Sequence, residues 1–201
     1  MPTPKRTVIA YHLVWTAYGT WLPNDPRGSG SKRVVSEKLL DLGEVHYGRR
    51  KQQPSPRDVR AFYKIAEPRL SFPVIRFDPA QAQEIGSGFA SCILGQRYTC
   101  YACAILPDHI HLVIRKHRDR AEEMIANLQA ASRERVLTEF EATLPQNHPI
   151  WTTGGWRGFI DNPEHMRSVI RYVEQNPVKS GGTQQEWSFV SAYDGWSFAR
   201  R

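Results

Sequence analysis

The sequence predicts an α+β protein with a ferredoxin-like antiparallel sheet, helices on one face of that sheet, and an additional helix near the C-terminus. Alternating apolar stretches, typical of strands, are separated by amphipathic stretches that begin with helix-start signals. Their order is strand, helix, strand, strand, helix, strand, which is the order of the ferredoxin-like motif. The 201 residues suffice for one hydrophobic core and are few for two. We therefore expect a single domain over residues 1–201.

The first predicted strand is followed by a long irregular segment. Residues 7–16 are rich in β-branched and aromatic side chains, which favours a strand. Residues 17–77 interrupt the pattern, because prolines, glycines and short polar side chains typical of turns gather near residues 19–33. Short helices are expected near residues 36–42 and 57–67. We interpret residues 17–77 as an insertion with little regular structure.

Regular structure resumes at residue 78. Asp78 can cap a helix and Pro79 suits its first position. This helix should run to about Leu94, where Gly95 gives a stop signal. The remaining elements of the motif are, in chain order, strands over residues 98–106 and 109–115 joined by a tight turn at Pro107 and Asp108, a long amphipathic helix over residues 119–141, and a strand over residues 151–159 that Gly154 and Gly155 interrupt.

A last helix is predicted to begin at residues 161–164, whose sequence Asp-Asn-Pro-Glu is a strong start signal. It should end near Gln175, because Asn176 precedes Pro177 and is biased away from helical backbone angles. The tail over residues 183–201 is expected to pack back on the domain through its aromatic side chains. These are Trp187, Phe189, Tyr193 and Trp196.

The composition favours a polyanionic partner. The chain has 27 Lys and Arg against 20 Asp and Glu, a net charge of +7 and an isoelectric point near 9.5. This balance suits nucleic acid, although many soluble proteins are mildly basic. No apolar run approaches the roughly 20 residues that span a bilayer. Residues 1–6 are not followed by the apolar stretch of a signal peptide, so we expect a cytoplasmic protein without membrane attachment.

The three cysteines, Cys92, Cys100 and Cys103, are expected to be small core residues. An odd number without a secretion signal argues against a disulfide framework. Cys100 and Cys103 lie three positions apart in a predicted strand and should face opposite sides of it. They could therefore not easily share one zinc ion.

Two histidines stand at the start of the predicted strand over residues 109–115. A strand directs residues i and i+2 to one face, so His109 and His111 should lie side by side while the apolar residues beside them point into the core. Neighbouring neutral imidazoles are good ligands for first-row metals. The alternative is a pair of polar side chains on a solvated strand face.

The last predicted helix carries a second polar pair. At about 100° per residue, its apolar side chains form one arc, and Tyr172 and Asn176 stand one turn apart on the flank of that arc. A tyrosine in such a position is usually an amphipathic packing residue, and an asparagine before proline is usually a helix stop. The helix alone therefore leaves a structural role open for both.

Together, the two pairs resemble motifs of the single-tyrosine HUH transposases, which include the TnpA-like insertion-sequence transposases and the REP-associated tyrosine transposases. The matching stretches are residues 106–113 (Leu-Pro-Asp-His-Ile-His-Leu-Val) and 171–181 (Arg-Tyr-Val-Glu-Gln-Asn-Pro-Val-Lys-Ser-Gly), with weaker matches at residues 11–16, 150–161 and 187–189. The chain departs from the compact members of this family in its long insertion and in the glycine-rich stretch over residues 154–158.

The resemblance implies a site and a chemistry. His109, His111 and Asn176 would bind a divalent metal, Mg²⁺ or Mn²⁺, and Tyr172 would be the catalytic nucleophile. The enzyme would cut single-stranded DNA, leaving a 5′-phosphotyrosine link and a free 3′-hydroxyl, and would later rejoin the strand to another end during DNA transposition. The resemblance also implies a homodimer and a DNA substrate that folds into hairpins.

Several basic and aromatic side chains near these motifs are candidates for contacts with DNA. Phosphate contacts are predicted for Arg115, Arg157, Arg167, Arg171 and Lys179. Exposed tryptophans such as Trp21 or Trp156 could stack on unpaired bases. The alternative is that the charges only solvate the surface and that the tryptophans belong to the core.

Two other functions stay open at this point. A ferredoxin-like sheet is also the frame of the RNA-recognition motif, a non-catalytic module that binds single strands by stacking, although the sequence has no RNP-type aromatic pattern on a middle strand. A small-molecule metalloenzyme could use the histidine pair, but it would leave the positive charge and the pairing of Tyr172 with Asn176 without purpose.

Overall fold

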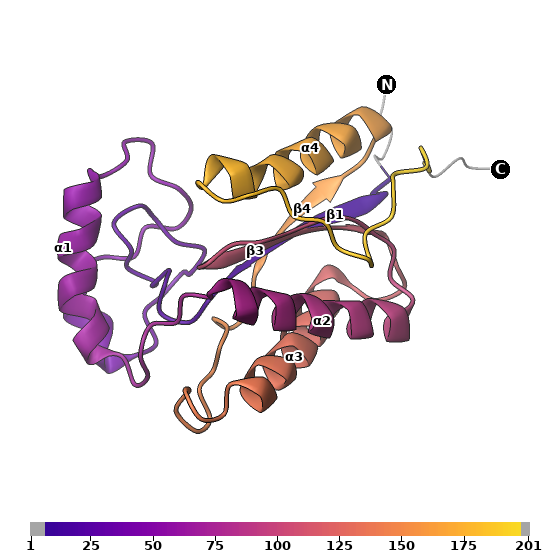
Figure 1. Cartoon of the computed structure of the whole chain (residues 1–201). Helices are drawn as coiled ribbons and strands as arrows, with labels where there is room; N and C mark the ends of the chain where they lie inside the picture. Colours follow the sequence, from indigo (N-terminus) through magenta and orange to yellow (C-terminus); the bar gives the residue numbers. More distant parts are fainter. Residues whose placement is uncertain (1–6, 198–201) are drawn as a thin grey trace.

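The computed structural model describes residues 7–197, so residues 1–6, where no signal peptide was expected, and the end of the predicted tail lie outside the described residues. Within that range, one antiparallel sheet has the strand order β2-β3-β1-β4 (Figure 1). The strands are β1 (Ala10–Thr16), β2 (Cys100–Ile105), β3 (His109–Arg115) and β4 (Trp156–Ile160). With helices connecting β1 to β2 and β3 to β4, this is the ferredoxin-like arrangement, and the predicted α+β class is confirmed.

The helices lie on both faces of the sheet. Helices α2 (Pro79–Gln96) and α3 (Ala121–Glu139) cover one face, and α4 (Pro163–Lys179) lies across the other (Figure 1). The two helices of the motif thus share one face, as predicted, and the additional helix packs on β2 and β3 from the opposite side.

The two-residue period of the strands fills both faces with apolar side chains. Leu13 and Leu112 belong to the larger core, between the sheet and helices α2 and α3. Ala10 and Val113 belong to the smaller core, beneath α4. Because β2 is covered on both sides, each of its residues is buried. In β3, His109 and His111 alternate with Ile110 and Leu112, which point into the larger core. The two histidines therefore point to the opposite face of the sheet, where α4 lies.

The predicted end of α2 was placed too early. The helix begins after the expected cap, Asp78, whose side chain accepts from the Gln81 N–H as part of a capping box. It passes Gly95 and ends at Gln96, and Arg97, which follows it, has a left-handed φ of 58°. The Tyr98 N–H then donates to the Ile93 carbonyl, as expected for a left-handed helix end.

The end of α4 near Gln175 was also predicted wrongly, because the helix continues through Pro177 to Lys179. A proline this close to a helix end removes one backbone hydrogen bond. Its buried ring compensates by packing, and the Ser180 N–H donates to the Asn176 carbonyl at 3.0 Å, which closes the last turn. Asn176 therefore stays helical, one turn beyond Tyr172.

The strand predicted over residues 151–159 is interrupted at Gly154 and Gly155, as expected, but its first part is no strand, and β4 begins only at Trp156. Ile150 and Gly154 have positive φ angles of 60° and 79°, which interrupt an extended backbone. Trp151 keeps an isolated bridge to Ala17. The new strand β4 pairs with β1 alone, so it forms an edge of the sheet.

The cysteines are partly as predicted. Cys100 and Cys103 are buried, but a bulge between Cys100 and Ala102 shifts the alternation, so both contribute to the larger core instead of facing opposite sides. Burial raises the pKa of the Cys100 thiol to about 12, which keeps it protonated and a poor metal ligand.

The insertion contains a helix, α1 (Pro56–Ala66), and two short 3-10 helices, η1 (Glu37–Leu42) and η2 (Glu67–Arg69), near the positions predicted for short helices. Its own apolar cluster is made by Leu22, Leu39 and Ala66. The insertion lies beside the sheet end where β1 stops and β3 begins (Figure 1). There the Ala17 N–H donates to the Asp108 carbonyl at 2.9 Å.

The described part of the tail packs back on the domain as predicted. Trp187 and Phe189 contact the larger core, and Tyr193 and Trp196 contact the smaller one. Gly86 of α2 makes room for the Trp187 indole, because a Cβ at that position would lie 2.2 Å from it. Within residues 7–197, no helix has both the length and the apolar character needed to cross a membrane.

Candidate metal-binding and nucleophile site

Three imidazoles gather on the α4 side of the two central strands. His109 and His111 lie side by side on β3, as predicted, with ring centroids 4.9 Å apart. His12 of β1 joins them: its Nε2 lies 2.9 Å from His111 Nδ1, and the two rings stack with centroids 5.1 Å apart. Sequence reasoning did not find His12, because its position beside His111 follows from the β1–β3 register and not from local spacing.

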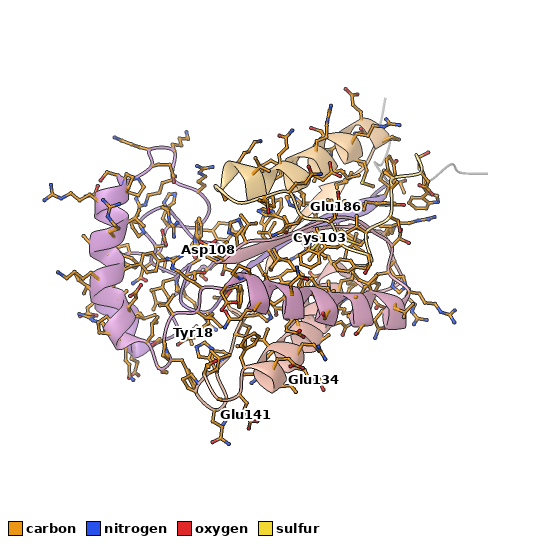
Figure 2. The ribbon with its side chains drawn as sticks, in the orientation of Figure 1. Tyr18, Cys103, Asp108, Glu134, Glu141 and Glu186 are labelled. Carbon is orange, nitrogen blue, oxygen red and sulfur yellow. The ribbon has the colours of Figure 1, made fainter. Side chains whose placement is uncertain are left out.

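His109 is held by the residue before it. Its Nδ1 lies 2.6 Å from the Asp108 carboxylate, at the end of the sheet nearest the insertion (Figure 2). The hydrogen bond with His109, helped by Arg76 at 3.8 Å, lowers the pKa of Asp108. A carboxylate that fixes one ring nitrogen leaves the other, Nε2, with a free lone pair, and this is the usual outer support of a metal-binding histidine.

His111 is held in a comparable way by a neutral partner. Burial lowers the pKa of His12 to about 4 and that of His111 to about 3, so both rings are neutral at pH 7. Neutral imidazoles share a hydrogen bond when one nitrogen donates and the other accepts. If His111 Nδ1–H donates to His12 Nε2, then His111 Nε2 is free to bind a metal. The opposite tautomer would block that nitrogen with a proton.

Helix α4 places a phenol beside these rings. The Tyr172 ring centroid lies 5.6 Å from that of His111 and 5.9 Å from that of His12, in edge contacts with both. Its side chain is 47% exposed, so a phosphate in solvent can reach it. The Lys179 ammonium lies 5.9 Å from the Tyr172 ring centre, two turns further along the helix.

Asn176 follows Tyr172 by one helical turn; the residue is half-buried, and the nitrogen of its side-chain amide is buried. Among the described residues, its Nδ2 has no hydrogen-bond partner. Because an amide can rotate to exchange its nitrogen and oxygen, this position can equally offer the oxygen to a ligand. An unsatisfied buried amide is costly unless something binds it, and a metal ion would supply such a partner.

The donor set fits a divalent ion with few protein ligands. Nε2 of His109, Nε2 of His111 and the Asn176 amide oxygen are the available groups. Within residues 7–197, no three His, Cys, Asp or Glu side chains surround one metal position. A third protein ligand beside the two histidines would therefore be the Asn176 amide, whose nitrogen is buried without a partner. The remaining coordination positions would fall to water or to phosphate oxygens.

The predicted DNA-contacting cations are spread over the molecule. Arg171 and Lys179 lie on α4 near Tyr172. Arg115, at the other end of β3 from His109, lies over the Trp196 ring at 3.7 Å, and Arg167 lies 5.8 Å from the Tyr193 ring centre. Arg157 lies opposite Leu13 of β1 in the sheet, and its guanidinium forms an ion pair with Glu122 of α3 at 2.9 Å. Because α3 covers the other face of the sheet, Arg157 points away from Tyr172. Of the predicted cations, Lys179 thus lies near the Tyr172 ring and Arg171 precedes Tyr172 in the helix, whereas Arg115 and Arg157 lie away from this site.

Comparisons with known proteins were made at the levels of sequence and structure. No protein-family model matches the sequence, and no curated protein matches it. A solved REP-associated tyrosine transposase bound to a REP hairpin is similar over 94% of this chain and 81% of its own, with 14% identity and a TM-score of 0.46. A protein assigned as a transposase from Deinococcus radiodurans R1 is similar over 91% of this chain and 98% of its own, with 13% identity and a TM-score of 0.37.

At these identities and TM-scores, the roles of individual residues rest on the geometry of this chain.

Proposed function

We propose that this protein is a transposase-type enzyme, a metal-dependent endonuclease and strand transferase that acts on single-stranded DNA through Tyr172. The observation that carries the proposal is the contact of an exposed phenol with the buried His111 imidazole, in a pair of β3 histidines that each have one ring nitrogen held by a partner. A packing tyrosine does not require two oriented, metal-competent imidazoles beside it. A plain metal site does not require an exposed phenol.

Mg²⁺ or Mn²⁺ is the proposed cofactor, held by His109, His111 and Asn176. When bound, the ion would polarise the non-bridging oxygens of the scissile phosphate and offset the charge that develops on them. Mn²⁺ accepts imidazole readily and Mg²⁺ prefers oxygen. Asp108 and His12 would keep the two imidazoles in the tautomer that binding requires.

Tyr172 would attack the phosphorus with its phenolic oxygen. The new bond joins that oxygen to the 5′-phosphate, and the bond to the 3′-oxygen breaks, so the proton lost by the phenol is balanced by the one gained by the 3′-hydroxyl. The Lys179 ammonium would stabilise negative charge as the phenol loses its proton. The reverse reaction with another 3′-hydroxyl rejoins the strand, and the covalent link conserves the phosphodiester energy in between.

A non-catalytic module related to the RNA-recognition motif fits the structure less well. Such modules stack bases on the open face of the sheet. Here α4 packs over β2 and β3 on the side of the sheet opposite to α2 and α3. On that side, the middle strands β1 and β3 carry histidines in place of exposed aromatic rings.

The proposed substrate is single-stranded DNA that contains a hairpin. One similar transposase was solved bound to a REP hairpin, and the sequence motifs imply the same kind of DNA for this chain. We also propose that the protein forms a homodimer and is located in the cytoplasm.

The test uses hairpin-containing single-stranded DNA labelled at its 3′ end, incubated with the protein and Mn²⁺ or Mg²⁺. A 5′-phosphotyrosine link retains the label on the protein in SDS gels, and EDTA should abolish that band. Tyr172→Phe should lose it, whereas the control Tyr47→Phe, which alters an exposed tyrosine of the insertion, should keep it. An adduct formed equally by Tyr172→Phe would refute the assignment.

A further inference from the structure

Trp156 is an exposed aromatic ring next to the proposed nucleophile. It lies on the edge strand β4, and its side chain is 58% exposed. Its ring meets the His12 ring edge-on, with centroids 5.5 Å apart and planes at 87°. Tyr172 contacts the same imidazole. The indole and the phenol therefore both contact the His12 ring, on the side of the sheet where α4 lies.

The backbone beneath Trp156 fixes its position. A Cβ at Gly158 would lie 2.6 Å from the outer ring of the indole, so the ring lies directly over that glycine. Because residue 158 has no side chain, the outer ring of the indole can lie close to the strand backbone. The indole is thus packed against Gly158 and against the His12 ring, while 58% of the residue stays exposed.

We propose that Trp156 is a stacking platform for an unpaired base adjacent to the scissile phosphate. This inference rests on the proposed function of Tyr172. A ring that is packed against its neighbours and still largely exposed offers stacking area while losing little side-chain freedom on binding. Stacking on an aromatic ring accepts every base, because every base has a π-face. In a duplex those faces are already covered, so the platform selects single-stranded DNA.

The chain offers a matched control on the same strand. Phe159 is 57% exposed, like Trp156, but it contacts Tyr11 on the opposite face of the sheet. In a Tyr172→Phe background, which prevents cleavage, we expect Trp156→Ala to weaken binding of hairpin DNA with unpaired flanking bases by about tenfold. Phe159→Ala should change that affinity by less than about twofold, since most exposed side chains contribute little.

Two further variants separate stacking from folding. Trp156→Tyr keeps an aromatic face and should retain most of the affinity. Gly158→Ala keeps the tryptophan in the sequence, but its added Cβ displaces the indole ring from its present position. This variant should also weaken DNA binding, as Trp156→Ala does. Each variant is checked by thermal unfolding, so that a loss of fold is not taken for a loss of stacking.

The decisive experiment removes single bases from the DNA. Fluorescence anisotropy measures the affinity of each protein for a series of oligonucleotides with one abasic site at successive unpaired positions. We expect one position at which removing the base weakens DNA binding by the protein that keeps Trp156 but not by the Trp156→Ala variant. If no position shows this coupling, or the protein does not bind single-stranded DNA, the platform is refuted. Coupling without a covalent adduct in the parent protein would instead refute catalysis and leave the platform standing.

Discussion

Replacing His12 with phenylalanine tests how the proposed metal ligands are held. The change keeps a ring of similar size against Tyr172 and Trp156, but it removes the nitrogen that lies 2.9 Å from His111 Nδ1. With His12 as acceptor, His111 presents a free Nε2 to the metal. Without it, the buried His111 ring loses the partner that selects this tautomer, and its Nδ1–H is unsatisfied whenever Nε2 binds an ion.

The size of the effect follows from burial. His111 is only 6% exposed, so water does not readily replace the lost partner. Leaving one buried polar group unpaired costs about 1–3 kcal/mol, and each 1.4 kcal/mol is about tenfold in affinity. Loss of the outer partner of a metal-binding histidine typically weakens metal binding by about 10- to 100-fold. Both routes predict that His12→Phe raises the Mn²⁺ dissociation constant by one to two orders of magnitude.

The assay is titration of the DNA-free protein with Mn²⁺, followed by calorimetry or by the loss of the free-ion paramagnetic resonance signal. His12→Gln is the matched control, because its side-chain oxygen can accept from His111 Nδ1–H. It should retain affinity to within about fivefold. Unfolding curves of both variants are measured without metal. If His12→Phe binds Mn²⁺ as tightly as the parent protein, the proposed role of His12 is wrong.

Three other predictions concern the same strands and helices. Asp108→Ala should weaken Mn²⁺ binding about tenfold in the same titration, while DNA binding in EDTA stays unchanged. In the folded protein, the pKa values of His12 and His111 lie at about 4 and about 3, below the ordinary 6.5. Between these lowered values and pH 6.5, the unfolded chain therefore binds more protons than the folded protein does. Urea unfolding in EDTA should therefore show stability falling from about pH 6 to pH 4, by up to about 1.4 kcal/mol per unit for each histidine, with a shallower fall for His12→Phe. Gly86→Ala would place a Cβ 2.2 Å from Trp187 and should cost about 1–3 kcal/mol in thermal unfolding, and a neutral result would contradict this packing. The control Gly95→Ala in the same helix, where a Cβ meets nothing within 4 Å, should be neutral or slightly stabilising.

The parts of the site that local periodicity determines could be predicted from the sequence. The two-residue period of β3 placed His109 and His111 on one face, and the helical period placed Asn176 one turn from Tyr172. The order of elements gave the ferredoxin-like sheet. These inferences need only the residue period of a single strand or helix, which can be read directly from the sequence.

The parts that depend on contacts between elements could not be predicted in this way. His12 meets His111 only because β1 and β3 pair in a particular register. The faces of Cys100 and Cys103 depend on a bulge that the alternation does not reveal. The direction of Arg157 is set by β4 pairing with β1 as an edge strand, and its nearness in sequence to the site was therefore misleading.

The end of α4 shows how a local rule can yield to tertiary packing. Asn176 before Pro177 favours a helix stop on backbone grounds. Pro177 is nevertheless buried against the sheet side of the helix, and the turn beyond it is closed by the Ser180 and Gly182 N–H groups. This extension is what keeps the Asn176 amide in register with Tyr172.

The most direct measurement is to identify the amino acid that carries DNA after cleavage. The protein is incubated with hairpin DNA and Mn²⁺, the adduct is digested with nuclease and protease, and the peptides are sequenced by mass spectrometry. The account predicts one nucleotide joined through its 5′-phosphate to Tyr172. Attachment to any other side chain, or cleavage that leaves no protein-bound nucleotide, would contradict it.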